Sequence, residues 1–504
     1  MMAGWPGPMR VGAKNFIRET DLESKYPALG LFIHGKWIYD RAEGENVVNP
    51  ATGEIIARLP HADETDLKAA ADSAKAGFDV WRAMPLSERT AILQRAVDLM
   101  RERAAAIGHA MTLDQGKPVR EATTEVSRAA SLIEWDLNQA QRLYGHIIPG
   151  RPGFQRYTLR QPIGPVAAFT PWNFPGSVMG RKMGGALAAG CSLVVKAAEE
   201  TPSTACEFVR CFEDAGLPAG VLNLVFGVPA KISEYLIASE HIRAISFTGS
   251  VPVGKHLAAL AASHMKPAVM ELGGSSPVII CADTDPRAAA RALGAAKFRN
   301  AGQICTAPTR FIVDRAVHDD FVDELVAYAK SLRLGDGLNA DTTMGPMANE
   351  RRVSAMPKLV DDARQRGASI KCGGQTHGAA GYFFEPTVVA DVPMDSLLMT
   401  TEPFGPIAPV VSFSTLDEAI RIANGTPYGL AAYAYTESAA TAHRLAEELE
   451  CGILSINHGE GAIAEAPFGG VKDSGYGREG GEQSLDAYTV VKFVSHRSTA
   501  EVKA

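Results

Sequence analysis

Cys305 stands in a small, polar, glycine-containing stretch, FRNAGQICTAPTR, whereas a core cysteine is normally flanked by bulky apolar residues. Such surroundings let a substrate approach the sulfur, and a cysteine thiolate is a strong nucleophile. A single cysteine is nevertheless more often a small buried hydrophobe than a nucleophile. We expect that role for the other six cysteines, which are Cys191, Cys206, Cys211, Cys281, Cys372 and Cys451. Cys305 therefore needs catalytic companions before chemistry can be assigned to it.

Two polar residues elsewhere in the chain are candidates for these companions. Glu271, in PAVMELGGSSP, directly follows an apolar strand and precedes Gly-Gly, a place where open α/β sheets bind ligands. Asn173, in FTPWNFPGS, lies between Pro171 and Pro175, whose rings restrict the backbone and hold the amide in place. A carboxylate can act as a general base, and an amide NH₂ can donate to a developing oxyanion. The structural alternatives are a Glu that caps a turn and an Asn that caps a helix.

The phosphate-binding signals are unusual. In FTGSVPVGKH, the residues Gly249, Gly254 and Lys255 have P-loop spacing, but His256 replaces the Ser or Thr that would bind Mg²⁺. We therefore reject a nucleotide triphosphatase, and no GxGxxG follows a strand either. A Gly-Ser turn that opens a helix still offers backbone N–H groups to a pyrophosphate.

The remaining patterns predict the elements that position these residues. Helical spacing extends from about 64 to 144, and alternation within 145–164 indicates a hairpin. Short apolar runs then alternate with helical stretches, a second such series extends from 277 to about 470, and 485–494 is again strand-like. The first series comprises strands at 165–169, 192–196, 221–226 and 244–249 and helices at 179–189, 204–215 and 231–239. The predicted fold class is α/β, with two Rossmann-like parallel-sheet domains and a small β element whose open edges a second subunit can cover.

Composition excludes several classes of function. The 504 residues are enough for about three domains, and 46% hydrophobic with 21% charged residues is typical of a soluble globular protein. A net charge of −7 without a Lys/Arg-rich run argues against nucleic-acid binding. The first twenty residues lack the apolar core of a signal peptide, and no apolar stretch is long enough to span a membrane. No CxxC pair signals a disulfide framework or a zinc site, so we expect a cytoplasmic protein with reduced thiols and no metal.

Seven motifs together resemble the aldehyde dehydrogenase superfamily: FTPWNFP, VVKAAEETP, FTGS, ELGGSSP, GQIC, TEPFGP and APFGG. They keep the family's order and spacing, the match extends from about Phe32 to Val494, and succinate-semialdehyde dehydrogenase-like members are the most similar in motif. The resemblance implies an NAD-binding domain (1–146 and 165–272), a catalytic domain (273–478) and an oligomerisation element (147–164 and 479–504). It also implies a homo-oligomer, either a dimer or a tetramer.

The resemblance further implies a role for each site residue. Cys305 resembles the nucleophile, Glu271 the general base and Asn173 the oxyanion donor, so that an aldehyde is oxidised through a thiohemiacetal and a thioester on the cysteine. The residues that it places against the nucleotide are Thr170, Pro171, Trp172, Lys196, Glu199, Gly227, Phe247, Gly249, Ser250, Leu272, Glu402 and Phe404.

Glu199 and two arginines bear on the cofactor and the substrate. An acidic residue three positions after Lys196 would bind the adenosine ribose hydroxyls and repel a 2′-phosphate, which favours NAD⁺ over NADP⁺. Arg181 and Arg299 resemble the residues that bind the distal carboxylate in succinate-semialdehyde dehydrogenases, since Arg suits a bidentate carboxylate contact. Either arginine could instead form a structural ion pair.

The chain departs from that subgroup at two places. The serine shortly before PFGG is missing, with Ala462 and Ile463 near its place, and Ala307 stands where some members carry a second cysteine. Glutarate or 2-oxoglutarate semialdehyde therefore fits as well as succinate semialdehyde.

The alternatives are a dehydrogenase of uncharged aldehydes, a CoA-acylating enzyme, a non-redox thiol esterase and a silent structural protein. Glu271 argues against CoA acylation. A CoA-acylating enzyme must keep water from the thioester, whereas a general base would activate water to attack it.

Overall fold

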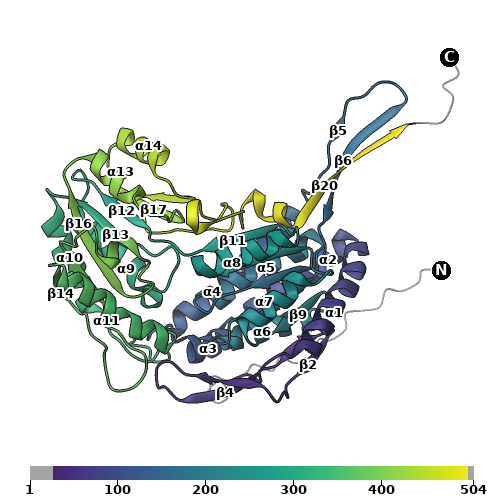
Figure 1. The fold of residues 1–504 in the computed structure, drawn as a ribbon, viewed down its shortest axis with the longest axis horizontal. Coiled ribbons are helices and arrows are strands. Elements are labelled where there is room, and N and C mark those ends of the chain that lie inside the picture. Colours follow the sequence, from purple (N-terminus) through teal and green to yellow (C-terminus); the bar gives the residue numbers. More distant parts are fainter. Residues whose placement is uncertain (1–25, 498–504) are drawn as a thin grey trace, which may run out of the picture.

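The computed structural model describes residues 26–497, which form two large sheets and a projecting arm (Figure 1). The eight-stranded sheet has the order β19-β11-β10-β7-β8-β9-β1-β2. Its strands are β1 (Leu31–Ile33), β2 (Lys36–Ile38), β7 (Val166–Phe169), β8 (Leu193–Lys196), β9 (Leu222–Val225), β10 (Ala244–Gly249), β11 (Ala268–Leu272) and β19 (Gly475–Tyr476). Strands β7 to β11 are parallel, whereas β1, β2 and β19 add antiparallel edges.

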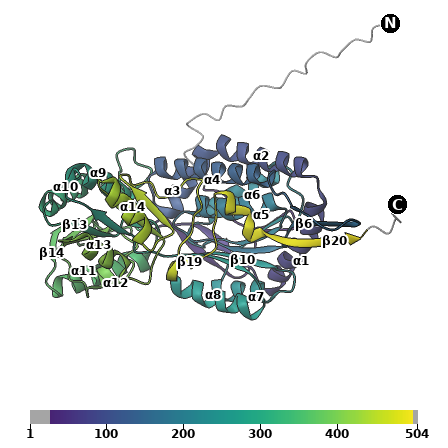
Figure 2. The same cartoon turned by 90° about the horizontal axis from the view of Figure 1, so that it is seen from above.

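Helices cover both faces of this sheet, which explains why its central strands are buried along their whole length and mostly apolar. Figure 2 shows α2 to α6 on one face and α1, α7 and α8 on the other, and two separate hydrophobic cores match this division. The helices are α1 (Glu64–Ala83), α2 (Leu86–Glu102), α3 (Ala104–Gln115), α4 (Val119–Ala140), α5 (Pro175–Ala189), α6 (Pro202–Asp214), α7 (Pro229–Ala238) and α8 (Val251–Ser263).

The second sheet has seven strands in the order β14-β15-β16-β13-β12-β17-β18, and all are parallel except β14. They are β12 (Pro277–Ile280), β13 (Arg310–Asp314), β14 (Ser369–Cys372), β15 (Thr387–Ala390), β16 (Ile407–Phe413), β17 (Ala431–Tyr435) and β18 (Ile453–Ile456). The accompanying helices are α9 (Pro286–Phe298), the 3₁₀-helix η2 (Arg299–Gly302), α10 (His318–Ser331), α11 (Glu350–Gln365), α12 (Leu397–Thr400), α13 (Leu416–Asn424) and α14 (Ala439–Glu448).

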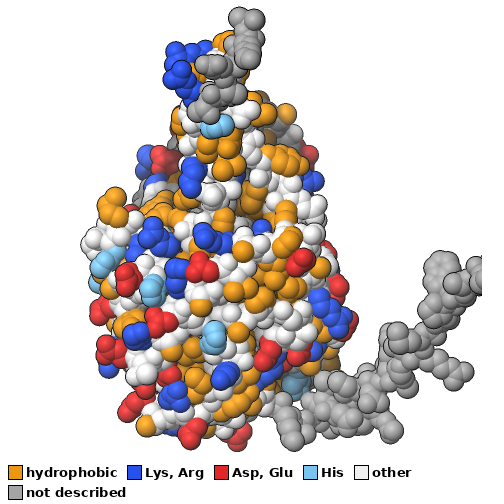
Figure 3. Space-filling view, turned by 90° about the vertical axis from the view of Figure 1, so that its right-hand side faces the viewer, with side chains coloured by type: hydrophobic (Ala, Val, Ile, Leu, Met, Phe, Trp, Pro, Cys, Tyr) orange, Lys and Arg blue, Asp and Glu red, His pale blue; other side chains and the backbone are white. Residues whose placement is uncertain are grey.

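A three-stranded antiparallel sheet leaves the body as an arm, formed by β5 (Ile147–Ile148), β6 (Phe154–Pro162) and β20 (Thr489–Arg497) (Figure 1). Figure 3 shows the arm above the body, with hydrophobic and basic side chains on its surface. Val491 and Phe493 of β20 are 63% and 58% exposed. A separate hairpin pairs β3 (Gly44–Val48) with β4 (Ile55–Pro60).

The predicted α/β class is confirmed, and so are the four predicted strands and three predicted helices of the first series, to within a few residues at each end. The strands of 31–60 were not predicted, because β1 has only three residues and β2, β3 and β4 mix exposed with more buried positions, so no apolar run marks them. Residues 485–488 are not strand but part of the 3₁₀-helix η4 (Glu482–Tyr488), since Leu485 and Tyr488 turn into the core. The short strand β19, inside the range expected for the catalytic domain, pairs with β11 of the first sheet.

Parts of two expected domain ranges, 1–25 and 498–504, lie outside the described residues. Within 26–497, no helix is both long and apolar enough to cross a bilayer. The same residues contain no group of three or more His, Cys, Asp or Glu side chains arranged to hold a metal ion.

Candidate active site

A pocket of about 470 Å³ lies between the two large sheets, and Cys305, Glu271 and Asn173 all line it. Asn173 follows β7, and Glu271 is near the carboxyl end of β11. Cys305 lies in the loop that leads from η2 into β13. The pocket therefore opens at the carboxyl ends of parallel strands, the usual ligand site of an open α/β sheet.

Two glycines allow the loops around this pocket to approach each other. A Cβ on Gly273 would lie 2.2 Å from Oε2 of Glu402, and one on Gly274 would lie 3.1 Å from the carbonyl oxygen of Cys305. A side chain at either glycine would crowd Glu402 or the Cys305 loop, so the Gly-Gly pair lets β11, that loop and Glu402 lie close together.

The Cys305 thiol is partly exposed to the pocket and otherwise enclosed. Burial raises its pKa to about 12, and the negative charges of Glu402 and Glu271 act in the same direction. The backbone before it is constrained, since Asn300 and Ala301 have φ of 48° and 50°, in the left-handed region. Such residues persist only where their surroundings hold them, which fits a loop that presents a reactive side chain.

Asn173 is held by contacts on both its side chain and its backbone. Its Nδ2 donates to the carbonyl of Gln303 at 3.0 Å, which uses one of two N–H groups and leaves the second for the pocket. Its carbonyl accepts from Nζ of Lys117 at 2.9 Å and from Nδ2 of Asn300 at 3.0 Å. The helix-cap alternative is wrong for Asn173, because Phe174 occupies the N-cap of α5 and its side chain makes no capping hydrogen bond.

Glu271 is buried, and within the described residues neither of its carboxyl oxygens has a hydrogen-bond partner. Burial and the charge of Glu479 raise its pKa well above the ordinary range, while Lys182, Arg181 and Arg478 act in the opposite direction. The turn-cap alternative is therefore wrong, because the carboxyl group accepts no backbone N–H. A buried, partnerless carboxyl beside a cysteine is suited to accept a proton from water.

Sequence reasoning missed a buried ion pair beside this base. Nζ of Lys182, on α5, lies 2.8 Å from Oε1 of Glu479, and Ser246 of β10 contacts both side chains. Glu479 also lines the pocket. No local motif marks either residue, and the distance of 297 positions between them hides the pair from a sequence pattern.

A second cleft, of about 640 Å³, adjoins the pocket and contains most of the residues expected to bind the nucleotide. These are Thr170, Pro171, Trp172, Lys196, Glu199, Gly227, Phe247, Gly249 and Ser250. Leu272, Glu402 and Phe404 line the pocket instead, next to Cys305. The expected set is thus divided between two hollows that share Pro171, Trp172 and the Gly249–Ser250 turn.

The cleft fits a dinucleotide. Oε2 of Glu199 accepts from Nζ of Lys196 at 2.6 Å and its Oε1 accepts from the N–H of Gly227 at 3.1 Å, so a carboxylate is fixed at the wall. Helix α8 begins directly after Ser250, whose side chain does not cap it, so the first N–H groups remain available to an anion. Among residues 26–497, Thr248 Oγ1 is buried there and has no hydrogen-bond partner.

Glu402 and Phe404 form the border between cleft and pocket. Oε1 of Glu402 accepts from the N–H of Gly274 at 3.2 Å, and burial raises its pKa to about 7. The Phe404 ring meets the Trp172 ring edge-on, with centroids 5.5 Å apart. This border thus combines an aromatic pair with a carboxylate.

The far wall of the pocket is basic. Arg181 is 8% exposed, and its guanidinium carbon lies 4.7 Å from the centroid of the Phe468 ring. Arg299 lines the same pocket, and so does Arg128 of α4, which sequence reasoning missed. Arg128 donates to the carbonyl of Ala462, the residue near the place of the missing serine.

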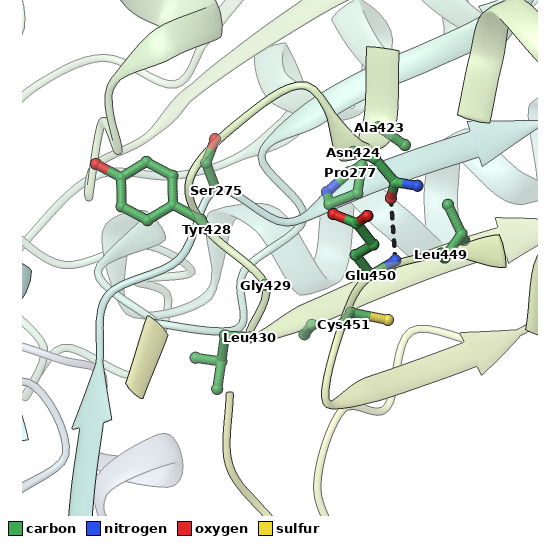
Figure 4. Close-up of a pocket in the computed structure, with 12 residues that line it drawn as sticks. Ser275, Pro277, Ala423, Asn424, Tyr428, Gly429, Leu430, Leu449, Glu450 and Cys451 are labelled. Carbon is green, nitrogen blue, oxygen red and sulfur yellow. Dashed lines mark hydrogen bonds between the residues drawn. The ribbon is translucent and has the colours of Figure 1, made fainter. Parts of the chain in front are cut away.

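The other cysteines have the core role expected of them. Cys191, Cys206 and Cys211 are buried in the first core, and the remaining three pack against the second. Near Cys451, a small hollow lies at the amino ends of β12 and β17, beside the end of α13, where the N–H of Glu450 donates to Asn424 (Figure 4). Its volume of about 10 Å³ can hold no more than one water.

Comparison with known proteins agrees with this geometry. The sequence profile of the Aldehyde dehydrogenase family matches residues 37–494. The chain is 48% identical over 468 residues to 4-(hydroxymethyl)benzenesulfonate dehydrogenase TsaD1 of Comamonas testosteroni, covering 92% of this chain and 98% of the relative. It is 40% identical over 489 residues to the NADP⁺-dependent succinate-semialdehyde dehydrogenase of Escherichia coli K12, covering 96% of this chain and 99% of the relative.

A solved structure leads to the same family. The NAD⁺ complex of an aldehyde dehydrogenase from Bacillus cereus superposes with a TM-score of 0.92 at 33% identity, covering 96% of this chain and 99% of that one. The profile and these relatives span nearly the whole chain. The chain therefore belongs to the aldehyde dehydrogenase family, as an NAD(P)-dependent enzyme that oxidises an aldehyde to its acid.

Proposed function

We propose that this enzyme oxidises a small aldehyde whose far end carries an acidic group, through a thioester on Cys305. The observation that carries the proposal is one pocket with a nucleophile, a base and an oxyanion donor at one end and arginines at the other. An aldehyde held by its acidic group against the arginines would present its carbonyl carbon to the sulfur.

Each catalytic side chain has a definite task in this proposal. After the Cys305 thiol has lost its proton to solvent, the thiolate sulfur bonds to the aldehyde carbon, the C=O π bond breaks, and the resulting oxyanion accepts from the Asn173 amide and the Cys305 backbone N–H. When bound, the nicotinamide supplies the two-electron acceptor that the oxidation requires. Glu271 then removes a proton from water, which attacks the thioester carbon and releases the acid and the thiol. Because Glu271 lines the pocket, hydrolysis is favoured over transfer to CoA.

Glu199 supports NAD⁺ as the preferred cofactor, with NADP⁺ possible but less favoured. Both of its oxygens are already occupied, by Lys196 and by the Gly227 N–H, so the carboxylate is fixed and charged at the cleft wall. It would repel a 2′-phosphate and accept from ribose hydroxyls. This arrangement would have no task in a non-redox thiol esterase.

Two observations support an acidic substrate. Among the described residues, neither Arg181 nor Arg299 forms an ion pair, so the structural alternative for these arginines lacks a partner. The relatives named above act on a benzenesulfonate compound and on succinate semialdehyde, and both substrates carry a negative charge. Succinate, glutarate and 2-oxoglutarate semialdehydes are the carboxylate candidates.

The test compares these semialdehydes with butanal, pentanal and benzaldehyde as substrates for NAD⁺ reduction. We expect a higher kcat/KM for the acids, and an increase in KM for the acids alone in Arg181→Ala and Arg299→Ala. Each lost charge-assisted contact should cost roughly tenfold or more in kcat/KM. A preference for uncharged aldehydes, or equal effects of the variants on both substrate types, would refute the acidic-substrate proposal.

We also propose that the arm is an oligomerisation element of a homodimer or tetramer. Its strands expose apolar side chains, including Val491 and Phe493, and an open strand edge. Sedimentation of the native chain and of a Val491→Lys, Phe493→Lys variant tests this proposal. A variant that keeps the native oligomeric state would contradict it.

A further inference from the structure

The basic wall of the substrate pocket contains more positive charge than two arginines provide. Arg128 from α4, Arg181 from α5 and Arg299 from η2 all line it. Within residues 26–497, none of the three has a carboxylate within ion-pairing distance. Two nearby acids already have partners, since Glu125 pairs with Lys117 and Glu479 pairs with Lys182. None of the three guanidinium groups is held in an ion pair, although further acids act on them through space: Asp136 and Glu271 on Arg181, Glu121 on Arg299 and Glu460 on Arg128.

Hydrogen-bond donors in the same wall also lack partners. Among the described residues, Arg181 Nη1 and Ser177 Oγ are buried without a hydrogen bond, and both residues line the pocket. They are four positions apart on α5, so they lie on one face of that helix. Buried donors without partners are costly, which indicates that a ligand with several acceptor oxygens completes them.

Arg128 is fixed in this wall by two contacts far apart in sequence. Helix α4 packs along α5, and the Arg128 guanidinium donates to the carbonyl of Ala462. Burial lowers the pKa of Arg128, and the positive charges of Arg299 and Arg181 lower it further. An anion bound among the three arginines would relieve this repulsion. The Ala462 side chain has no hydrogen-bond donor, whereas the Arg128 guanidinium that contacts its carbonyl has several.

We propose that Arg128 is a specificity-determining residue that, with Arg181 and Arg299, makes the pocket select an aldehyde carrying a sulfonate over one carrying a carboxylate. A carboxylate has two oxygens in one plane, which two guanidinium forks saturate. A sulfonate has three oxygens in a pyramid, so each arginine can donate to one of them. This inference rests on the proposed acidic substrate and names its acidic group.

The rest of the pocket wall guides the choice of test substrates. Trp172, Phe174 and Phe468 line it, together with Leu132 and Val178. A flat apolar body fits such a wall. The matched probes are therefore 4-formylbenzenesulfonate, 4-formylbenzoate and benzaldehyde, which differ only in the group opposite the aldehyde.

The experiment measures kcat and KM for the three probes in the native enzyme, Arg128→Ala and Arg128→Lys. We expect the native enzyme to prefer the sulfonate to the carboxylate roughly tenfold. Arg128→Ala should remove that preference by raising KM for the sulfonate far more than KM for the carboxylate or for benzaldehyde. Arg128→Lys keeps the positive charge but lacks the paired N–H donors of the guanidinium group, so it should retain only part of the preference for the sulfonate.

Arg120→Ala is the matched control, because Arg120 is an exposed arginine on the same helix and does not line the pocket. It should leave all three probes unaffected. Equal losses for sulfonate and carboxylate in Arg128→Ala would overturn the proposed selectivity, and so would no loss for either. A benzaldehyde preference in the native enzyme would refute the acidic-substrate proposal itself, which distinguishes the two failures.

Discussion

Lys182 and Glu479 form an ion pair beside the proposed general base, with 2.8 Å between Nζ and Oε1 and both side chains buried. The two charges act on Glu271 in opposite directions, since Glu479 raises its pKa and Lys182 lowers it. Burial is the largest cause of the raised pKa of Glu271, and this ion pair adjusts the pKa further.

Glu479→Gln should move the pH dependence of thioester hydrolysis to lower pH. The substitution removes a negative charge that raises the pKa of Glu271 and leaves Lys182, which lowers it, so Glu271 would lose its proton more readily. The measurement is kcat against pH under conditions where hydrolysis limits turnover. Ser246→Ala is the control, because it breaks the same network without removing a charge. An unchanged or alkaline-shifted profile in Glu479→Gln would show that the pair does not tune the base.

Native activity should rise with pH from about 6 to about 9 without an acidic optimum. Burial raises the pKa of Cys305 to about 12 and that of Glu271 well above its ordinary range, and both groups must lose a proton to act. Both pKa shifts therefore mean that the deprotonated, active forms of Cys305 and Glu271 become more abundant as the pH rises. The profile of kcat/KM for a semialdehyde provides the check, and a plateau already reached below about pH 6 would contradict this electrostatic account.

Glu199→Ser should increase kcat/KM with NADP⁺ relative to NAD⁺. The serine lacks the charge that would repel a 2′-phosphate, and it frees Lys196, which Glu199 binds at 2.6 Å, to contact that phosphate. Initial rates with both cofactors test this prediction. Glu207→Gln, on α6 and outside the cleft, provides a control of equal charge change. An unchanged cofactor ratio in Glu199→Ser would mean that another group selects the nucleotide.

Much of the site was predictable because its residues follow strands that the sequence marks clearly. Asn173 and Glu271 stand where apolar runs end, and parallel strands bring those ends to one edge of the sheet. Arg128 was not predictable in the same way. It lies inside an amphipathic helix like many exposed arginines, and only the packing of α4 on α5 and its contact with Ala462, 334 positions away, bring it into the pocket.

The segment directly before β20 shows the same limit of sequence-based prediction. Leu485 and Tyr488 continue the apolar pattern of β20, so a strand was predicted, yet both are buried in a 3₁₀-helix beside α5. Local pattern could not distinguish an apolar side chain that faces a neighbouring helix from one that faces across a strand. Tertiary packing decided this conformation.

The most direct test of the account is the mass of Cys305 in a Glu271→Gln variant mixed with NAD⁺ and aldehyde. Without its base, the enzyme should form the thioester in a rapid, stoichiometric burst of reduced cofactor and then turn over roughly 10²- to 10⁴-fold more slowly. The Cys305 peptide should gain the mass of the aldehyde less two hydrogen atoms, and Cys305→Ala should show neither burst nor adduct. A burst without an adduct on Cys305, or unimpaired turnover in Glu271→Gln, would contradict the assignment of nucleophile and base.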